Sequence, residues 1–373
     1  MSAAATSSSV AEERLLEAAR EGDEDAYRRL VERHRSELHA HCYRMLGSVH
    51  DAEDALQEAL LRAWRSLSKF ERRSSFRSWL YRIATNTCLD AIARRPKRVL
   101  PVDYAPAADP HQGPAEPLVE SVWVEPYPDR ELGIEDGHAA PEARYERREA
   151  VELGFIAALQ HLPPRQRAVL ILREVLGFSA REVAASLETS VASVNSALQR
   201  ARKAVDERLP DQSQQATLRS LGDEPLRELV EAYADAWERG DVETIAAMLT
   251  EEATVTMPPM PTWYRGRDAV VVFLTEWAFA RQWQRSRFVR RERRVRVVPT
   301  RASGQVAFGA YHWDPERRSY TPSALQVLGL RGERIEEIDG FVTPQIFPRF
   351  GLPAELSLDA EGRTDQFSGR PRS

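Results

Sequence analysis

The chain has 373 residues and a formal net charge of −5 at pH 7, with 42% hydrophobic and 29% charged residues. Its length exceeds one ordinary hydrophobic core and favours two or three domains. No apolar run reaches the roughly 20 residues of a transmembrane helix, and the N-terminal MSAAATSSSV lacks the regions of a signal peptide, so we expect a cytoplasmic protein without membrane association. The acidic net charge excludes a uniformly basic nucleic-acid binder, so the distribution of charge must decide that question.

The first predicted domain is a helical bundle over residues 12–98, preceded by a disordered tail over 1–11. It contains DAEDALQEALLRAWRSL (51–67), whose leucines and alanines recur at helical spacing and predict a buried face. The polar side chains of another face of this helix are Asp54, Gln57 and Glu58. They form an acidic surface for a basic partner, or alternatively an ordinary solvated face.

The next segment, FERRSSFRSWLYRIATNTCLDAIARR (70–95), interleaves aromatic and basic side chains. Aromatic rings stack on exposed bases and guanidinium groups neutralise phosphates, so this pattern suits single-stranded nucleic acid. The alternative is that the ring of Trp79 belongs to the core, because aromatic side chains at helical spacing usually pack inside.

A proline-rich stretch over residues 99–145 follows and shows no periodicity. We expect an extended linker that leaves its flanking domains independently placed. The helical pattern resumes over 146–210, where LPPRQRAVLILREVLGFSAREVAASLETSVASVNSALQRARKAV (162–205) predicts a helix-turn-helix. Ser179 is its expected N-cap and Glu188 lies in the turn.

The second helix of this motif, from Val191, has polar and basic side chains on its exposed face. Recognition helices place such residues against base edges in the major groove. Asn195 and Gln199 carry amides that can read adenine, whereas Arg200, Arg202 and Lys203 would mostly hold phosphates. An αα-hairpin that binds nothing is the alternative.

A short linker over residues 211–223 follows, and the hydrophobic pattern then changes over 224–353, which predicts a third domain. We expect a flexible tail over 354–373. Two helical stretches precede alternating segments at 294–298, 305–311 and 324–330. Alternation of this kind predicts the strands of an antiparallel sheet. The expected fold class is multidomain, with two all-α domains and a C-terminal α+β domain.

The pattern DAEDxxQExxLRAW followed by FRxWLYRIAxNxxLD resembles region 2 of the extracytoplasmic-function (ECF) group of sigma-70 factors. The resemblance implies that Asp54, Gln57 and Glu58 bind the β′ clamp of core RNA polymerase. It also implies a set of residues that bind the −10 promoter element. These are Arg72, Arg73, Phe76, Arg77, Trp79, Arg82 and Asn86.

The helix-turn-helix resembles region 4 of the same family, which reads the −35 element and contacts the β flap. The resemblance implies the −35 residues Ser193, Asn195, Ser196, Gln199, Arg200, Arg202 and Lys203. Glu188 departs from the family pattern, because a glycine is common at this turn position. The turn geometry is therefore expected to differ.

The C-terminal segment LRELVEAYADAWERGDVETIAAMLTEEATVTMPPMPTWYRGRDAVVVFL is similar to SnoaL-like (NTF2-like) cone domains. With the linker segment SVWVEPYPD (121–129), the whole chain resembles the sigma-G-like branch of ECF factors that carry such a domain. Some cone domains are enzymes with a buried carboxylate. The candidate lining groups here are Trp263, Tyr264, His312, Asp314 and Asp339.

These observations predict an alternative sigma factor that binds core RNA polymerase and promoter DNA and promotes transcription initiation. We expect no catalytic residues, metal or cofactor, and a C-terminal domain that modulates activity by intramolecular contact with the sigma domains. Two alternatives are a stand-alone helix-turn-helix regulator and an enzymatic C-terminal domain with a DNA-binding output. A small-molecule ligand of the cone is a further option.

Overall fold

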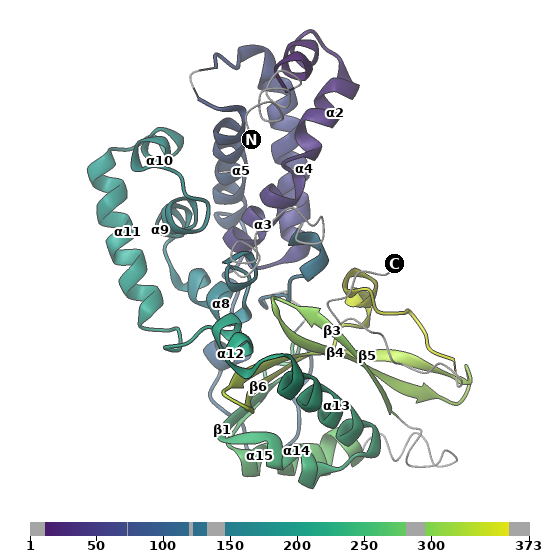
Figure 1. Ribbon diagram of the computed structural model, residues 1–373. Helices are drawn as coiled ribbons and strands as arrows, with labels where there is room; N and C mark the ends of the chain where they lie inside the picture. The colour runs from purple at the N-terminus through teal and green to yellow at the C-terminus, as the bar shows by residue number, and fades with distance from the viewer. Residues whose placement is uncertain (1–11, 73, 119–121, 133–145, 281–294, 358–373) are drawn as a thin grey trace. The chain divides into compact units, whose positions relative to one another are not determined.

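The computed structural model describes residues 12–72, 74–118, 122–132, 146–280 and 295–357 (Figure 1). Its described residues divide into two compact units. The first unit comprises residues 12–98, 131–132 and 154–209, and the second comprises 99–130, 146–153 and the remainder from 210. None of the helices described combines the length and apolar character of a membrane span.

The first part of the first unit is a bundle built around three neighbouring helices (Figure 1). Its helices are α2 (Glu24–Glu32), α3 (Arg35–Leu46), α4 (Val49–Ser66) and α5 (Phe76–Ile92), with a 3-10 turn η1 (Leu67–Lys69) between the last two. Helix α3 is buried on nearly all sides and lies against both α4 and α5. Its core includes Leu38, Tyr43 and Met45, each at most 1% exposed.

The second part of the first unit contains the predicted helix-turn-helix. Its elements are α8 (Leu153–His161), α9 (Pro164–Leu170), η3 (Ile171–Val175), α10 (Ala180–Ser186) and α11 (Val191–Asp206). Ser179 begins α10 as predicted, and with Glu182 it forms a capping box that satisfies backbone N–H groups of the first turn. Val183, Val194 and Leu198 are buried where the helices of the motif meet.

The second unit is built on a six-stranded sheet. Its strands are β1 (Leu249–Thr256), β2 (Trp263–Arg265), β3 (Val295–Ala302), β4 (Gln305–Asp314), β5 (Ser319–Arg331) and β6 (Arg334–Phe341). The order is β2-β1-β6-β5-β4-β3, and every neighbouring pair is antiparallel except β1 and β6. The predicted segments 305–311 and 324–330 fall on β4 and β5. Residues 295–298 of the predicted segment 294–298 fall on β3, and residue 294 lies outside the described residues.

Helices α13 (Asp223–Arg239), α14 (Val242–Met248) and α15 (Arg267–Phe273), continued by η4 (Leu274–Ala278), pack on one face of this sheet (Figure 1). Their apolar side chains share one core with the strands, in which the ring of Tyr233 lies 4.8 Å from that of Phe308. Helix α12 (Gln214–Leu221) and the 3-10 segment η6 (Pro344–Phe350) complete the unit. This α+β architecture confirms the predicted fold class.

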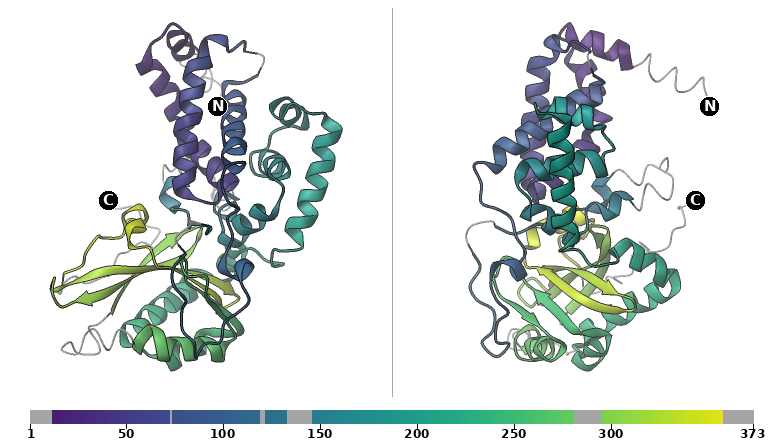
Figure 2. Two further views of the ribbon diagram at one scale, coloured as in Figure 1. Left: turned by 180° about the vertical axis from the view of Figure 1, so that it is seen from behind. Right: turned by 90° about the vertical axis from the view of Figure 1, so that its left-hand side faces the viewer.

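The linker over residues 99–130 is part of the second unit and includes the short helices α6 (Pro101–Tyr104) and η2 (Asp129–Leu132) (Figure 2). Trp263 Nε1 donates to Ala105 O at 2.7 Å, and Trp123 Nε1 donates to Pro259 O at 3.0 Å. Trp123 and Tyr127 are buried. Tryptophan side chains and backbone groups therefore attach these residues of the linker to the C-terminal domain.

Candidate polymerase and promoter interface

Helix α4 displays the predicted polymerase-binding side chains. Ser48 begins the helix, with its hydroxyl accepting a hydrogen bond from Asp51 N at 3.1 Å, and the alanine-rich face packs inward. Asp54 and Gln57 are exposed and Glu58 is half-buried, all on the outer side. Leu61 continues this face at helical spacing with 42% of its surface exposed. Sequence reasoning missed Leu61, although an apolar residue three positions beyond Glu58 was a usable signal.

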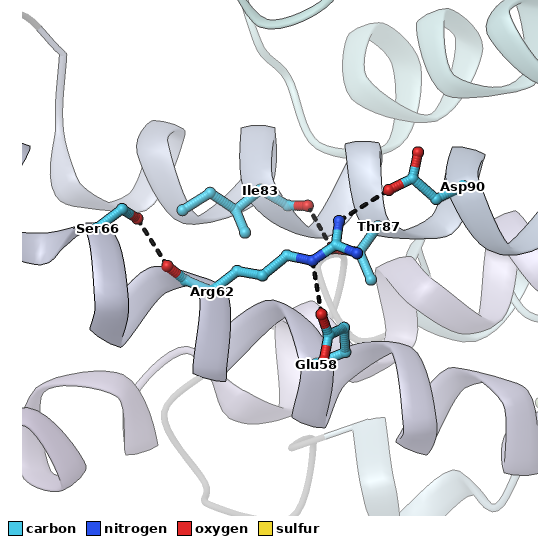
Figure 3. Close-up of polar contacts among 6 residues, drawn as sticks. All are labelled: Glu58, Arg62, Ser66, Ile83, Thr87 and Asp90. Carbon is cyan, nitrogen blue, oxygen red and sulfur yellow. Dashed lines mark hydrogen bonds and ion pairs between the residues drawn. The ribbon is translucent and has the colours of Figure 1, made fainter.

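Glu58 is held in place by a charged network between α4 and α5 (Figure 3). Arg62 Nε donates to Glu58 Oε1 at 2.7 Å, and Arg62 Nη1 donates to Asp90 Oδ2 at 2.8 Å. The two carboxylates raise the pKa of the Arg62 guanidinium. Arg62 therefore fixes one member of the acidic face while connecting it to the helix predicted to read the −10 element.

A second ion-pair network lies at the beginning of α4. Asp51 is buried, and its carboxylate accepts a hydrogen bond from Arg98 Nη2 at 2.5 Å and pairs with Arg95. Arg95 also lies 3.6 Å from the Asp54 carboxylate. Because a buried carboxylate needs a partner, Asp51 fixes the chain that leaves α5 against α4. Asp54 in turn has its charge partly balanced by Arg95.

The aromatic residues predicted for −10 binding form a cluster at the beginning of α5. Phe76 is 4% exposed and its ring lies 5.6 Å from that of Trp79, which is half-buried. Phe70 completes the cluster, with its ring 5.0 Å from Trp79. Trp79 is thus partly accessible to solvent, whereas stacking of Phe76 on a base requires its buried ring to leave the cluster.

The arginines predicted for −10 binding carry acidic partners. Arg72 has a φ of 57° and pairs with Glu13 at 2.9 Å, while Arg77 binds Glu37 at 3.0 Å. Arg82 is exposed and binds a glutamate of the helix-turn-helix. Asn86 is exposed on α5, and Arg73 lies outside the described residues.

Helix α11 carries all seven residues predicted to bind the −35 element, and each is exposed. Ser193 begins the row, with its N–H bound to the Ser190 N-cap hydroxyl at 3.1 Å. Arg202 binds Glu174 at 2.7 Å, and Lys203 lies 3.9 Å from Glu207. The structure therefore brings the −35 candidates together on one surface. The buried side is formed by Val194 and Leu198, as the sequence predicted.

The two DNA-reading parts of the first unit contact each other through α5 and the first helix of the helix-turn-helix. Arg82 Nη2 donates to Glu188 Oε1 at 2.6 Å, and Ser78 Oγ donates to Glu182 Oε1 at 3.3 Å. The ring of Phe178 lies 5.3 Å from that of Tyr81. Glu188 has a φ of 52°, so the position where a glycine was expected adopts the left-handed conformation and aims its carboxylate at Arg82.

The candidate lining groups of the C-terminal domain do not form one site. The Asp339 carboxylate accepts from Thr256 Oγ1 at 2.7 Å, and burial raises the pKa of this carboxyl. It shares a row across the sheet with Ala307, and His312 lies five residues further along β4, about 16 Å from Ala307 along the strand.

The other three groups have separate surroundings. Asp314 accepts the N–H groups of Glu316 and Arg317 in a turn. Trp263 binds the linker, and Tyr264 stacks on Phe273 with ring centroids 4.9 Å apart. No acid–base pair among them emerges from these contacts.

Comparison with known families matches three parts of the chain. Residues 30–98 match Sigma-70 region 2, residues 153–205 match Sigma-70, region 4, and residues 230–338 match the SnoaL-like domain. The chain is 40% identical to the ECF RNA polymerase sigma factor SigG of Mycobacterium tuberculosis, covering 90% of this chain and 86% of that protein. It is 30% identical to the ECF RNA polymerase sigma factor SigW of Bacillus subtilis, covering 52% of this chain and 93% of that protein.

Among solved structures, the extracytoplasmic function sigma factor SigJ of Mycobacterium tuberculosis shares the fold with a TM-score of 0.54 at 21% identity. The match covers 86% of this chain and 97% of the SigJ chain. The chain belongs to the ECF RNA polymerase sigma factors. The predicted resemblance is thereby confirmed, and regions 2 and 4 make the protein a promoter-recognition and transcription initiation factor rather than a stand-alone regulator.

Proposed function

We propose that the acidic face of α4 binds the β′ clamp of core RNA polymerase and that region 4 binds the β flap. The observation that supports the first contact is the outer side of α4, where Asp54, Gln57 and Glu58 precede the exposed Leu61 on the same face. Apolar side chains next to polar and charged ones are the usual composition of a specific protein interface. Arg62 supports the proposal by holding Glu58 in a fixed position.

For the −35 element, α11 enters the major groove, and some of its polar side chains read bases while others bind phosphates. Asn195 and Gln199 lie one turn apart on the exposed face and read base edges. Arg200 and Lys203 neutralise phosphates, which gives affinity and salt dependence without sequence preference. Ser193 and Ser196 complete the contact surface near the beginning of the helix.

For the −10 element, phosphates of the promoter DNA replace the glutamates that pair with Arg77 and Arg82 in the protein alone. Glu37 and Glu188 occupy Arg77 and Arg82 in the state described, so these cations become available to phosphates when the glutamates move away. Trp79 then offers a ring to an unstacked base. Opening of the promoter is driven by this binding to single-stranded DNA, and the polymerase performs the chemistry.

The C-terminal domain, in this proposal, modulates transcription without catalysis. Three of its candidates, Asp339, Asp314 and Trp263, are engaged in separate hydrogen bonds. The C-terminal domain is also hydrogen-bonded to the linker between regions 2 and 4 through Trp263 and Trp123. The protein acts in the cytoplasm, where polymerase and promoter DNA are found.

Run-off transcription with purified core polymerase tests the function. The template is the region upstream of the protein's own gene, and the chain is used at full length. We expect a specific transcript that disappears when Asn195 and Gln199 are both replaced by alanine. Transcripts that persist unchanged with this double variant would contradict the role assigned to α11.

A further inference from the structure

The turn between β3 and β4 is a meeting point of chain segments that are far apart in the sequence. Ser303 and Gly304 both have positive φ, at 55° and 71°. Ser303 N donates to Tyr127 O at 2.7 Å, Tyr127 N donates to Ser303 Oγ at 2.9 Å, and Gly304 N donates to Asp129 Oδ1 at 2.7 Å. The end of the linker is therefore hydrogen-bonded to this turn through backbone groups and the side chains of Ser303 and Asp129.

The segment that leads into region 4 contacts the same turn. A side chain at Gly304 would lie 2.8 Å from the backbone oxygen of Arg148, so only glycine allows this close approach. Leu153 N donates to Gln305 Oε1 at 3.0 Å, next to the turn on β4. Gln305 is 2% exposed and its amide also donates to Leu328 O. The chain is thus fixed to the sheet at the residue where region 4 begins.

The segment that follows region 4 returns to this place as well. Glu152 accepts the N–H groups of Gln214 at 3.1 Å and Gln215 at 2.7 Å, which are the first residues of α12. Ser213 Oγ accepts the next N–H, from Ala216, at 3.2 Å. Glu152 is buried, and this burial raises the pKa of its carboxyl to about 7 despite the two hydrogen bonds.

Gln214 and Gln215 attach α12 to the sheet through their side chains. Gln215 Nε2 donates to Gly304 O at 2.6 Å, so the residue that Glu152 caps also binds the turn. The Gln214 amide donates to Leu330 O at 3.0 Å and accepts from Leu330 N at 2.7 Å. Both ends of region 4 are therefore joined to each other and to one point of the C-terminal domain.

We propose that Glu152 is a positioning residue for −35 recognition, which acts by clasping the two ends of region 4 together on the β3–β4 turn of the C-terminal domain. The inference rests on the proposed function of region 4. The chain leaves the second unit just before residue 154 and returns to it just after residue 209, and both points lie at the clasp. The clasp therefore limits how far region 4 can extend from the C-terminal domain. The clasp restricts the distances from the −10 element at which region 4 can bind the −35 element.

The experiment is run-off transcription on a series of promoters whose −35 to −10 spacing changes in steps of a single base pair. The full-length chain is compared with Glu152→Ala. Glu152 accepts two hydrogen bonds, and losing both is enough to shift the clasp toward its open form by about tenfold. We expect the ratio of transcription at unfavourable spacing to transcription at the optimum to rise by a similar factor in Glu152→Ala.

Asp241→Ala is the matched control. Asp241 also caps a helix of the C-terminal domain, accepting from Thr244 N at 3.0 Å at the beginning of α14, and its carboxylate lies 3.9 Å from Arg239 in the same domain. We expect its spacing profile to match that of the unmodified protein. The conservative variant Glu152→Gln keeps an acceptor oxygen for one N–H group and should restore much of the spacing selectivity, which mere loss of stability does not explain.

Two results overturn the proposal. Identical spacing profiles for Glu152→Ala and the unmodified protein would show that the clasp does not position region 4. Equal broadening in Asp241→Ala would assign the effect to general loosening of the domain. An unmodified chain that is inactive at every spacing contradicts the proposed function first and removes this inference with it.

Discussion

The contacts inside the first unit differ in kind from those inside the second. In the first unit, regions 2 and 4 meet through exposed charges, such as the pair between Arg82 and Glu188, whose side chains are 46% and 76% exposed. In the second unit, the linker and the chain ends of region 4 are held by buried backbone and amide groups around Ser303 and Gly304. Exposed ion pairs contribute little and are screened by salt, whereas unmaking buried hydrogen bonds is costly.

This difference separates contacts that can be exchanged from contacts that persist. Phosphates and polymerase side chains can replace the glutamates of the first unit at small cost, because each partner is solvated in either state. The second unit offers no such exchange, since its groups would be left buried without partners. The proposed function requires that arginines be released to DNA while the C-terminal domain stays attached to the linker, and this division of contacts serves both requirements.

The largest expected effect is loss of polymerase binding when the acidic face is reversed. Asp54→Lys should weaken affinity for core polymerase by at least about 30-fold, because it places a cation where the partner's own cations lie. Asp25→Lys, at an acidic position of α2 that is 79% exposed, should bind normally. Fluorescence titration with labelled chain measures both, and equal affinities for the two variants would refute the assignment of α4.

The second effect concerns the persistent contacts. Gly304→Ala should destabilise the second unit by about 3 kcal/mol, because a left-handed conformation and a clash with Arg148 O act together. Gly332→Ala has the same sign of φ, at 59°, but nothing within 4 Å, and should cost about 1 kcal/mol. Urea unfolding followed by tryptophan fluorescence compares the two variants, and equal midpoints would mean that the turn tolerates separation from the backbone at Arg148.

Smaller effects are expected on α11, where base reading and phosphate binding can be told apart. Asn195→Ala should cost about 1–3 kcal/mol of promoter affinity and relax preference at one base of the −35 element. Lys203→Ala should weaken binding to all sequences alike and reduce the salt slope by about one. Electrophoretic mobility shifts of holoenzyme at several salt concentrations measure both quantities, and a sequence preference altered by Lys203→Ala would reverse the two roles.

The smallest effect is expected at the exchangeable contact itself. Glu188→Gln removes the acidic partner of Arg82 and should tighten binding of a single-stranded −10 oligonucleotide by about threefold, the scale of an exposed ion pair. Glu174→Gln breaks an equally short pair with Arg202 elsewhere in region 4 and should leave this affinity unchanged. Fluorescence anisotropy measures both, and unchanged binding by Glu188→Gln would mean that Arg82 is available already.

Local patterns in the sequence predicted much of this architecture. The N-cap at Ser179, the buried Val194 and Leu198, and strands β3, β4 and β5 of the C-terminal sheet follow from residue type and periodicity. The attachment of the linker could not be predicted, because its proline-rich composition shows no periodicity and its partners, such as Trp263, lie far away in the chain. Glu152 was missed for the same reason, since a cap supplied from a distant residue leaves no local signal.

Hydrogen exchange of the full-length chain, alone and in holoenzyme with promoter DNA, tests the central distinction most directly. We expect the amides of Gln214, Gln215, Ser303 and Gly304 to keep their protection on binding, while amides of α5 and α10 change theirs as the charged contacts between regions 2 and 4 are exchanged. Loss of protection at the β3–β4 turn, with unchanged exchange in α5 and α10, would contradict the account.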